Sequence, residues 1–116
     1  MENIEIVFSP ASQRELKKLE RRDQIIVFKK LEELESCPRP SGMEKIQGHP
    51  KFYRVSAGRD HRIIYHIFQE KLLVVLVIRD RKEAYRSLGD LDGKLAVALQ
   101  AVESRAVEEI RLSNRG

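Results

Sequence analysis

Four residues between positions 54 and 85 combine three cationic side chains with one phenol: Arg54, Arg62, Arg81 and Tyr85. Arginine is suited to binding phosphate, because its planar fork can donate to two phosphate oxygens and stays charged at any working pH. Such donors can also stabilise charge that builds up on phosphoryl oxygens during a reaction. Residue types alone support this chemistry and a merely solvated, arginine-bearing sheet face about equally.

The distribution of charge points in the same direction. The chain has 22 Lys or Arg and 18 Asp or Glu, which gives a net charge of +4. Nine of the cations and only four of the acids lie between Lys51 and Arg86, so this third of the chain carries the whole surplus. Phosphate backbones are the commonest partner for such a concentration, because binding them releases counterions. A solvated charged face is the alternative, and charge alone favours it.

Several familiar catalytic and metal-binding patterns are absent from the sequence. It contains no phosphate-cradling glycine loop, no GxSxG and no HExxH. His61 and His66 are five residues apart on a predicted strand and so point to opposite faces, while His49 falls in a loop without an obvious co-ligand. Asp80 and Glu83 are flanked by basic residues, which favours ion pairs over a catalytic dyad. We therefore expect no metal site and no cofactor.

Length and composition indicate one folded domain with a tail. The chain has 116 residues, of which 41% are hydrophobic and 34% charged, as is usual for globular proteins. Cys37 is the only cysteine, so no internal disulfide can form. The N-terminal residues lack the pattern of a secretory signal, and the longest apolar run, residues 72–78, is too short to span a membrane. A cytoplasmic location is expected.

The first half of the chain is expected to form a strand followed by two helices. Residues 3–8 alternate as a short strand. Ser9 is a suitable N-cap for the first helix, with Pro10 at its first position, and Asp23 is a suitable N-cap for the second. Residues 43–50 are expected to form a loop, because Gly48 and Pro50 interrupt any regular pattern.

The second half has the pattern of a strand meander. FYRVS, HRIIYHIF and KLLVVLVI are joined by connections short enough for hairpins. The last of these segments is apolar on both faces, which favours a central place in the sheet. The predicted fold is α+β, in the order β-α-α-β-β-β, with two helices on the apolar face and the first strand at the edge. Strand parity puts Arg54 and Arg62 on the other face, which we expect to be accessible.

A further helix is expected over residues 94–112. An apolar stripe runs along it, formed by Leu95, Leu99, Val102, Ala106 and Ile110. The stripe could pack on the domain, on a second copy of the chain or on another protein, and the sequence does not choose among these. We expect residues 1–88 to be the functional domain and residues 89–116 to be a helical extension.

Residues 3–88 resemble the RelE/ParE toxin superfamily. The segment GMEKIQGHPKFYRVSAGRDHRIIYHIFQEKLLVVLVIRDRKEAYRSL is similar to the superfamily pattern KL.G...YR.R.G.YR..Y, which precedes an apolar strand and a closing R.E.Y element. IEIVFSPASQRELKKLERRDQIIVFKKLEEL resembles the strand and helical hairpin that open these toxins. The individual motifs are weak, but their order, spacing and element types agree throughout.

The resemblance implies a toxin that is neutralised by a small cognate antitoxin protein. In the RelE-like branch it implies an endoribonuclease that cuts mRNA on the ribosome without a metal, by attack of the RNA 2′-hydroxyl on the adjacent phosphate. Carried over by position, the catalytic candidates are Arg54, Arg62, Arg81 and Tyr85. Arg54 would orient the phosphate, Arg62 and Arg81 would stabilise its charge, and Tyr85 would stack on a base or take part in proton transfer. The candidate RNA contacts around them are Lys51, Ser56, Arg59, His61 and Lys82.

Two departures from the RelE-like pattern keep other functions open. Ser56 stands where well-known RelE-like enzymes carry a second basic residue, and Asp80 stands where some relatives carry a histidine before the closing arginine. Both changes make the site less basic. The alternatives are therefore a ParE-like toxin that inhibits DNA gyrase, and a toxin-derived binding module whose activity has faded and whose last helix serves self-association.

Overall fold

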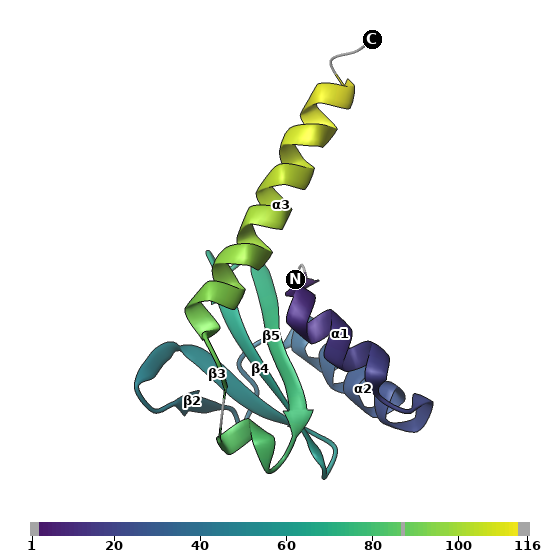
Figure 1. The fold of residues 1–116 in the computed structure, drawn as a ribbon, viewed down its shortest axis with the longest axis vertical. Coiled ribbons are helices and arrows are strands. Elements are labelled where there is room, and N and C mark those ends of the chain that lie inside the picture. The colour runs from purple at the N-terminus through teal and green to yellow at the C-terminus, as the bar shows by residue number, and fades with distance from the viewer. Residues whose placement is uncertain (1–2, 87, 114–116) are drawn as a thin grey trace.

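The computed structural model describes residues 3–86 and 88–113. The chain folds in the expected α+β order, with two short additional elements, a strand before the meander and a 3-10 helix after it (Figure 1). The elements are β1 (Glu5–Phe8), α1 (Pro10–Lys18), α2 (Arg21–Ser36), β2 (Glu44–Ile46), β3 (His49–Ala57), β4 (His61–Phe68), β5 (Leu72–Asp80), η1 (Glu83–Tyr85) and α3 (Leu91–Ser113).

The five strands form one mixed sheet in the order β1-β5-β4-β3-β2. β1 pairs with β5 in parallel, and the other neighbours are antiparallel. The predicted positions of the first and last strands are confirmed, because β1 lies at one edge and β5 lies between β1 and β4. Short connections explain the antiparallel meander, whereas α1 and α2 carry the chain from β1 to β2 at the opposite edge, so that the meander returns β5 to a parallel position beside β1.

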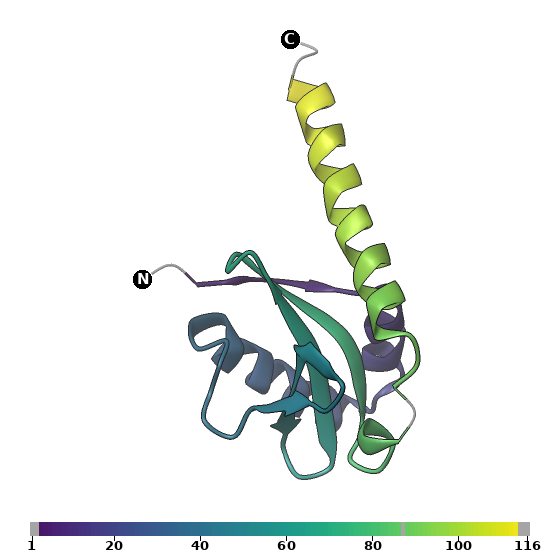
Figure 2. The same cartoon turned by 90° about the vertical axis from the view of Figure 1, so that its left-hand side faces the viewer.

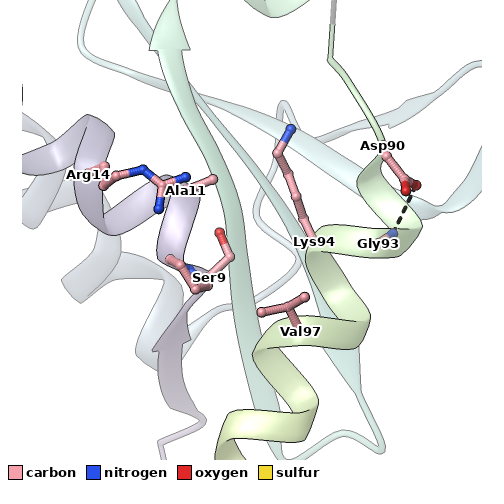
Figure 3. A pocket seen from close by; sticks show the side chains of 8 residues that line it. Ser9, Ala11, Arg14, Asp90, Gly93, Lys94 and Val97 are labelled. Atoms are coloured by element: carbon pink, nitrogen blue, oxygen red, sulfur yellow. Dashed lines mark hydrogen bonds between the residues drawn. The ribbon is translucent and has the colours of Figure 1, made fainter.

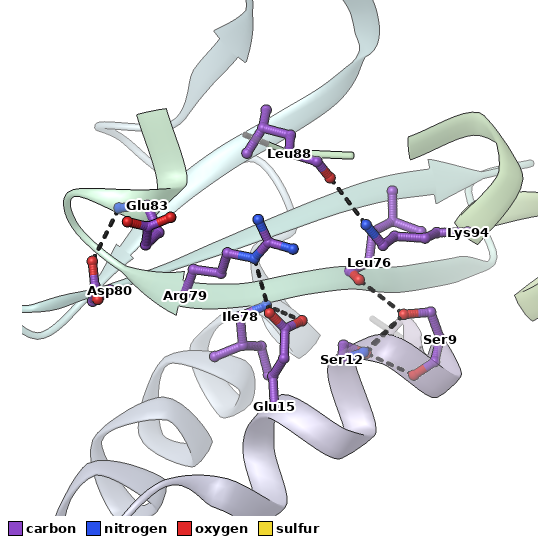
Figure 4. A network of polar contacts seen from close by, with 10 residues as sticks. All are labelled: Ser9, Ser12, Glu15, Leu76, Ile78, Arg79, Asp80, Glu83, Leu88 and Lys94. Carbon is purple, nitrogen blue, oxygen red and sulfur yellow. Dashed lines mark hydrogen bonds and ion pairs between the residues drawn. The ribbon is translucent and has the colours of Figure 1, made fainter. Parts of the chain in front are cut away.

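α1 begins as expected at a serine cap, and the cap also joins the helix to the sheet. The Ser9 Oγ accepts the backbone N–H of Ser12 and donates to the Leu76 carbonyl at 2.9 Å. The Ser12 Oγ lies within hydrogen-bonding distance of the carbonyls of Ser9 and Val75, and Figure 4 shows the contacts among Ser9, Ser12 and Leu76. Both serines are fully buried. β1 ends at Phe8, so it does not continue beside β5 past Val75. The two hydroxyls and the Ser9 N–H instead satisfy the carbonyls of Val75 and Leu76.

The prediction that Asp23 caps the second helix is wrong. α2 starts at Arg21, and its N-cap is Glu20, which makes no side-chain capping hydrogen bond. Asp23 lies within the first helical turn, where a carboxylate is favourably placed near the positive end of the helix dipole. The helix is held by burial of one face, on which Val27, Leu31 and Leu34 are almost fully enclosed.

The prediction of a loop over residues 43–50 is also wrong. Residues 44–46 form β2, which pairs with β3 so that Glu44 lies opposite Arg54. Gly48 supplies the turn between the two strands with a φ of 79°, a conformation that costs glycine little. Pro50 is accommodated near the start of β3, beside the register shift that ends the β2–β3 pairing.

The sheet has a core on each face. α1 and α2 cover the first face, where the fully buried residues include Ile63, Tyr65 and Leu73. The other face has its own core around Phe52 and Ile64, into which the first turns of α3 pack. The expectation that the second face is left open is therefore wrong for part of it. Leu91, Leu95 and Ala98 of α3 cover the β5 side of that face, and the β3–β4 end that bears the arginines lies beside η1.

Only the first half of α3 belongs to this core. In Figure 2 the helix runs past the sheet and its last turns project away from the rest of the chain. All residues from Glu103 to Ser113 are exposed, including Val107, Ile110 and Leu112. The predicted stripe is thus divided, because Leu95 packs on the domain while Ala106 and Ile110 do not.

An irregularity in β5 decides which side chains share the second face. The β4–β5 register shifts between Ile64 and Tyr65, so Ile64 pairs with Val77 and Tyr65 with Val75. Leu76 and Val77 consequently both enter the core of the second face. Before this point the even-numbered residues of β5 lie on the second face, and after it the odd-numbered residues do. Arg79 is brought opposite Arg62 as a result.

Candidate phosphate-binding site

Three polar side chains form a row across the end of the sheet. Ser56 of β3 is opposite Arg62 of β4, and Arg62 is opposite Arg79 of β5. Paired residues on neighbouring strands have side chains on the same face, with β-carbons about 5 Å apart. The row therefore lies on the second face of the sheet, beyond the part that α3 covers.

Arg54 and Tyr85, two of the predicted catalytic residues, are in direct contact. The guanidinium carbon of Arg54 lies 3.8 Å from the centre of the Tyr85 ring. Arg54 Nη2 pairs with Glu44 Oε2 at 3.0 Å, and Nη1 donates to the Ala84 carbonyl at 3.3 Å. The Arg54 side chain is only 12% exposed, whereas Tyr85 is 52% exposed. The phenol therefore faces solvent and the guanidinium lies beneath it.

Arg62 and Arg81 are linked through the turn between β3 and β4. Arg62 Nη1 donates to the carbonyls of Arg59 and His61, at 3.1 and 2.8 Å. The backbone N–H of Arg81 donates to the Asp60 carbonyl in the same turn, at 2.8 Å. Arg81 itself is exposed, as are its neighbour Lys82 and the turn residue Arg59. These residues line the same end of the sheet as Ser56.

Asp80 has a different role from the ion pair that its basic neighbours suggested. Its Oδ1 accepts the backbone N–H of Glu83 at 3.0 Å and so caps η1, the short helix that carries Tyr85 (Figure 4). This backbone hydrogen bond is the main reason that the pKa of Asp80 lies below its usual value of 3.8. Asp80 thus helps to position Tyr85.

Arg79 is a member of the cluster that the sequence analysis missed. Its Nε donates to Glu15 Oε2 of α1 at 3.0 Å, and the other oxygen of Glu15 accepts the Ile78 N–H (Figure 4). About a quarter of each side chain is exposed. Simple alternation along β5 would put Arg79 on the helix-covered face with Leu73 and Val75, and only the register shift moves it to the arginine face.

Two predicted RNA contacts lie apart from this cluster. Lys51 is at the other end of β3, where its Nζ pairs with Asp92 of α3 at 2.8 Å. His61 is nearly buried and alternates with Arg62, so it belongs to the opposite face of β4. The structure therefore brings together Arg54, Ser56, Arg59, Arg62, Arg81, Lys82 and Tyr85, with Arg79 in addition.

A groove of about 390 Å³ opens beside the Arg54–Tyr85 pair. Its polar and charged lining residues include Gln47, His49, Arg54 and Arg86. The ring of Tyr85 forms part of its wall. The groove is large enough for part of a nucleotide but not for an extended strand of RNA.

A second hollow, of about 410 Å³, lies between α1 and α3 (Figure 3). It is lined by Ser9, Pro10, Ala11, Arg14, Asp90, Gly93, Lys94 and Val97, and so contains none of the predicted site residues.

Over the residues that the structure describes, there is no group of three or more His, Cys, Asp or Glu that could hold a metal ion. No helix within those residues has the length and apolar character needed to cross a membrane.

Comparisons with solved structures identify similar folds. The isolated RelE toxin of E. coli is 24% identical, with a TM-score of 0.59, and the match covers 92% of this chain and 98% of that one. The toxin–antitoxin complex RelBE of E. coli gives 24% identity and a TM-score of 0.57, over 66% and 94% of the two chains. A RelBE complex of Mycobacterium tuberculosis gives 20% and 0.60, over 68% and 99%. At this level of identity the matches establish the fold.

The sequence itself matches a family model. No curated protein sequence matches significantly. However, the model of the ParE toxin of the type II toxin–antitoxin system parDE matches residues 6–85. The match begins at the second residue of β1 and ends at Tyr85, so it includes the rest of the sheet, both N-terminal helices and the arginine cluster, which consists of Arg54, Arg59, Arg62, Arg79 and Arg81 with their neighbours Ser56, Lys82 and Tyr85. The chain therefore belongs to the ParE toxin family of type II toxin–antitoxin systems, within the RelE/ParE superfamily.

Proposed function

We propose that this toxin is an endoribonuclease that cuts mRNA on the ribosome and thereby inhibits translation. The observation that carries the proposal is the gathering of Arg62, Arg79 and Arg81 at one end of the sheet beside the exposed phenol of Tyr85. Arg62 and Arg79 lie directly opposite each other on neighbouring strands, where like charges are destabilising. A phosphate group placed among them would remove this repulsion.

The proposed reaction uses the RNA itself as the nucleophile. The 2′-oxygen forms a bond to the adjacent phosphorus as its proton is taken up by a base, and the bond from phosphorus to the 5′-oxygen breaks. The leaving oxygen takes up a proton, so the products are a 2′,3′-cyclic phosphate and a 5′-hydroxyl. Arg62 and Arg81 would stabilise the charge on the phosphoryl oxygens, an effect of roughly 3–4 kcal/mol for one well-placed donor.

Arg79 can compensate for the missing basic residue at position 56, where the RelE-like pattern has a cation and this chain has Ser56. The serine removes one cation from the β3 end of the row, and Arg79 adds one at the β5 end. Glu15 offsets part of that charge through its hydrogen bond to the Arg79 Nε. The row thus keeps two guanidinium groups, with their centre displaced from β3 towards β5. The expected result is an altered geometry of phosphate binding rather than its loss.

The ribosome would supply most of the binding surface. The groove beside Tyr85 is about 390 Å³, the size of a site for one small molecule, and cannot enclose an extended strand of RNA. Placing the scissile bond correctly against so small a site requires that the RNA be held from outside. The substrate of the proposed reaction is therefore mRNA fixed in the ribosomal A site rather than free RNA.

A ParE-like action on DNA gyrase is the second candidate. The family model that matches residues 6–85 is that of the ParE toxin, and the only basic residue on β3 in the cluster, Arg54, is paired with Glu44. Both observations suit a toxin that works by binding a protein. A catalytically faded module would show neither activity.

We also propose that the toxin is held inactive by a small antitoxin protein. The similar structures include complexes of RelE toxins with RelB antitoxins. A partner that covers the arginine cluster should present acidic side chains to it. Within this proposal residues 1–88 are the toxin domain, and residues 89–116 are an extension whose first turns complete its core.

Two parallel assays test the proposal. Purified toxin is added to a cell-free translation reaction, and the ends of the message are mapped, using a normal message and one with a 2′-deoxynucleotide at the cut position. Gyrase supercoiling is measured beside it. Cleavage of the normal message alone, leaving a 2′,3′-cyclic phosphate, is expected. Cleavage of the deoxy message would contradict the proposed nucleophile, and blocked supercoiling with intact message would favour the ParE-like action.

A further inference from the structure

Arg54 is enclosed by its own neighbours to a degree that is unusual for a phosphate ligand. One face of its guanidinium is covered by the Tyr85 ring, Nη2 is paired with Glu44, and Nη1 donates to the Ala84 carbonyl. Within the described structure the buried Nε has no acceptor. With 12% of the side chain exposed, Arg54 presents only a small part of its surface to the groove, and its Nη1 and Nη2 are already engaged.

The same contacts fix η1 from two sides. The helix has three residues, and a single 3-10 turn has little stability of its own. Asp80 accepts the Glu83 N–H at its start, and Arg54 donates to the Ala84 carbonyl within it. Stacking of the guanidinium beneath the ring then sets the orientation of the Tyr85 side chain, since a cation is attracted to the face of an aromatic ring.

The strand β2 completes the arrangement. Glu44 lies opposite Arg54 in the β2–β3 register, so the backbone places its carboxylate beside the guanidinium. Glu44 itself is exposed, whereas Arg54 is not. The carboxylate therefore balances the charge of Arg54 at the rim of the site and holds the guanidinium fork in the plane that meets the ring.

We infer that Arg54 is a positioning residue, which holds the ring of Tyr85 at the wall of the groove and does not contact the scissile phosphate. The inference rests on the proposed ribonuclease activity and changes the role that the superfamily resemblance implied for Arg54. It leaves Arg62 and Arg81 as the groups that touch the phosphate. It also leaves the outer face of Tyr85 free to meet the RNA.

A double-mutant cycle tests this role. Single-turnover cleavage of a ribosome-bound message is measured for Arg54→Gln, Tyr85→Ala and the double variant, with unfolding curves for each. If Arg54 acts only through Tyr85, each single change lowers the rate by about 10- to 100-fold, and the double variant is no slower than Tyr85→Ala. If the rate loss of the double variant instead equals the product of the two single losses, Arg54 contacts the substrate independently of Tyr85, and the inference is overturned.

Two further variants separate positioning from phosphate binding. Arg54→Lys keeps a cation beneath the ring, so it should recover part of the rate lost in Arg54→Gln. If the glutamine variant does not fold, Arg54→Lys takes its place in the double-mutant cycle. Glu44→Gln removes the negative charge, while the amide oxygen of glutamine can still accept the hydrogen bond from Arg54 Nη2 and so keep the stacked pair. A positioning role predicts a rate equal to wild type or a few-fold lower. A clear increase would mean that Glu44 restrains a phosphate ligand and would overturn the inference.

NMR tests the contact without reference to cleavage. The Tyr85 ring should give cross-peaks to the Arg54 side chain in the wild-type protein, and its chemical shifts should move towards those of a free tyrosine in Arg54→Gln. A ring whose shifts and contacts to Ala84 do not change in that variant would overturn the inference. If the wild-type toxin cuts no message, the proposed function fails, and this measurement alone then decides whether Arg54 holds Tyr85.

Discussion

The carboxylate of Glu15 joins α1 to the end of β5 by accepting two hydrogen bonds, from the Arg79 Nε at 3.0 Å and from the Ile78 N–H at 3.3 Å. The contact lies where β1 no longer pairs with β5, so the side chain of a helix satisfies a strand donor that would otherwise lack a partner. It also holds one arginine of the cluster in place. Glu15 thus links the stability of the helical layer to the geometry of the site.

Replacement of Glu15 by alanine should measurably destabilise the fold. Both hydrogen bonds involve a charged, largely buried acceptor, so we expect a loss of about 2 kcal/mol in the free energy of unfolding. Urea denaturation followed by circular dichroism measures the loss. Glu33→Ala is the matched control, because Glu33 also pairs with a cation but is exposed, and it should have little effect. Equal losses in the two variants would contradict the role given to Glu15.

The serine cap of α1 should contribute comparably. Ser9→Ala removes both the cap of the helix and the donor to the Leu76 carbonyl, inside the core. We expect a loss of about 1–2 kcal/mol, the range measured for capping residues. Ser36→Ala is the control, since that exposed hydroxyl bonds only to the nearby Glu33 carbonyl. The account of the α1–β5 junction would be wrong if the two serines behaved alike in thermal unfolding.

The cap on η1 should weaken in acid. The pKa of Asp80 is lowered in the folded chain, so its contribution to stability is fully present above the ordinary value of 3.8 and is lost as the pH falls through the lower, folded value. The amide shift of Glu83 should therefore titrate below about pH 4. NMR spectra recorded through this range measure the transition. It should be absent in Asp80→Asn, and its persistence there would assign it to another group.

Burial along α3 predicts a sharp difference between its two halves. Leu95→Ala should cost about 2–5 kcal/mol, because Leu95 packs in the second core. Residues 104–113 are all exposed, so truncation after Glu103 should change the unfolding free energy by less than about 0.5 kcal/mol. Sedimentation of the truncated protein also tests the prediction of self-association through this helix. A fall in oligomeric state would support it, and an unchanged state would contradict it.

The sequence was sufficient to predict the elements whose patterns are local. The strand meander follows from short turns between apolar runs, and the central place of β5 follows from residues that are apolar on both faces. Ser9 and Pro10 identify the start of α1 because capping depends on neighbouring residues alone. β2 was missed since three residues give no usable alternation, and Gly48, which makes the hairpin turn, was interpreted as the interior of a loop.

The site could be predicted only in part for a similar reason. Arg54, Arg62 and Arg81 were singled out because arginines stand out on or next to apolar strands, and Tyr85 because it follows Arg81 by about one turn. The register shift near Leu76 lies in a uniformly apolar strand, so alternation could not reveal it, and Arg79 was assigned no role. The pairing of Arg54 with Glu44 depends on β2, which was not predicted.

The most direct test of the central claim compares two cation-to-alanine variants in cleavage of a ribosome-bound message. Arg81→Ala should lower the single-turnover rate by at least about 100-fold with an unchanged unfolding curve, since Arg81 is exposed and its backbone bond to Asp60 is kept. Lys71→Ala, at the opposite end of the β4–β5 hairpin, should cleave like the wild type. Equal rates in the two variants would contradict catalysis by the arginine cluster.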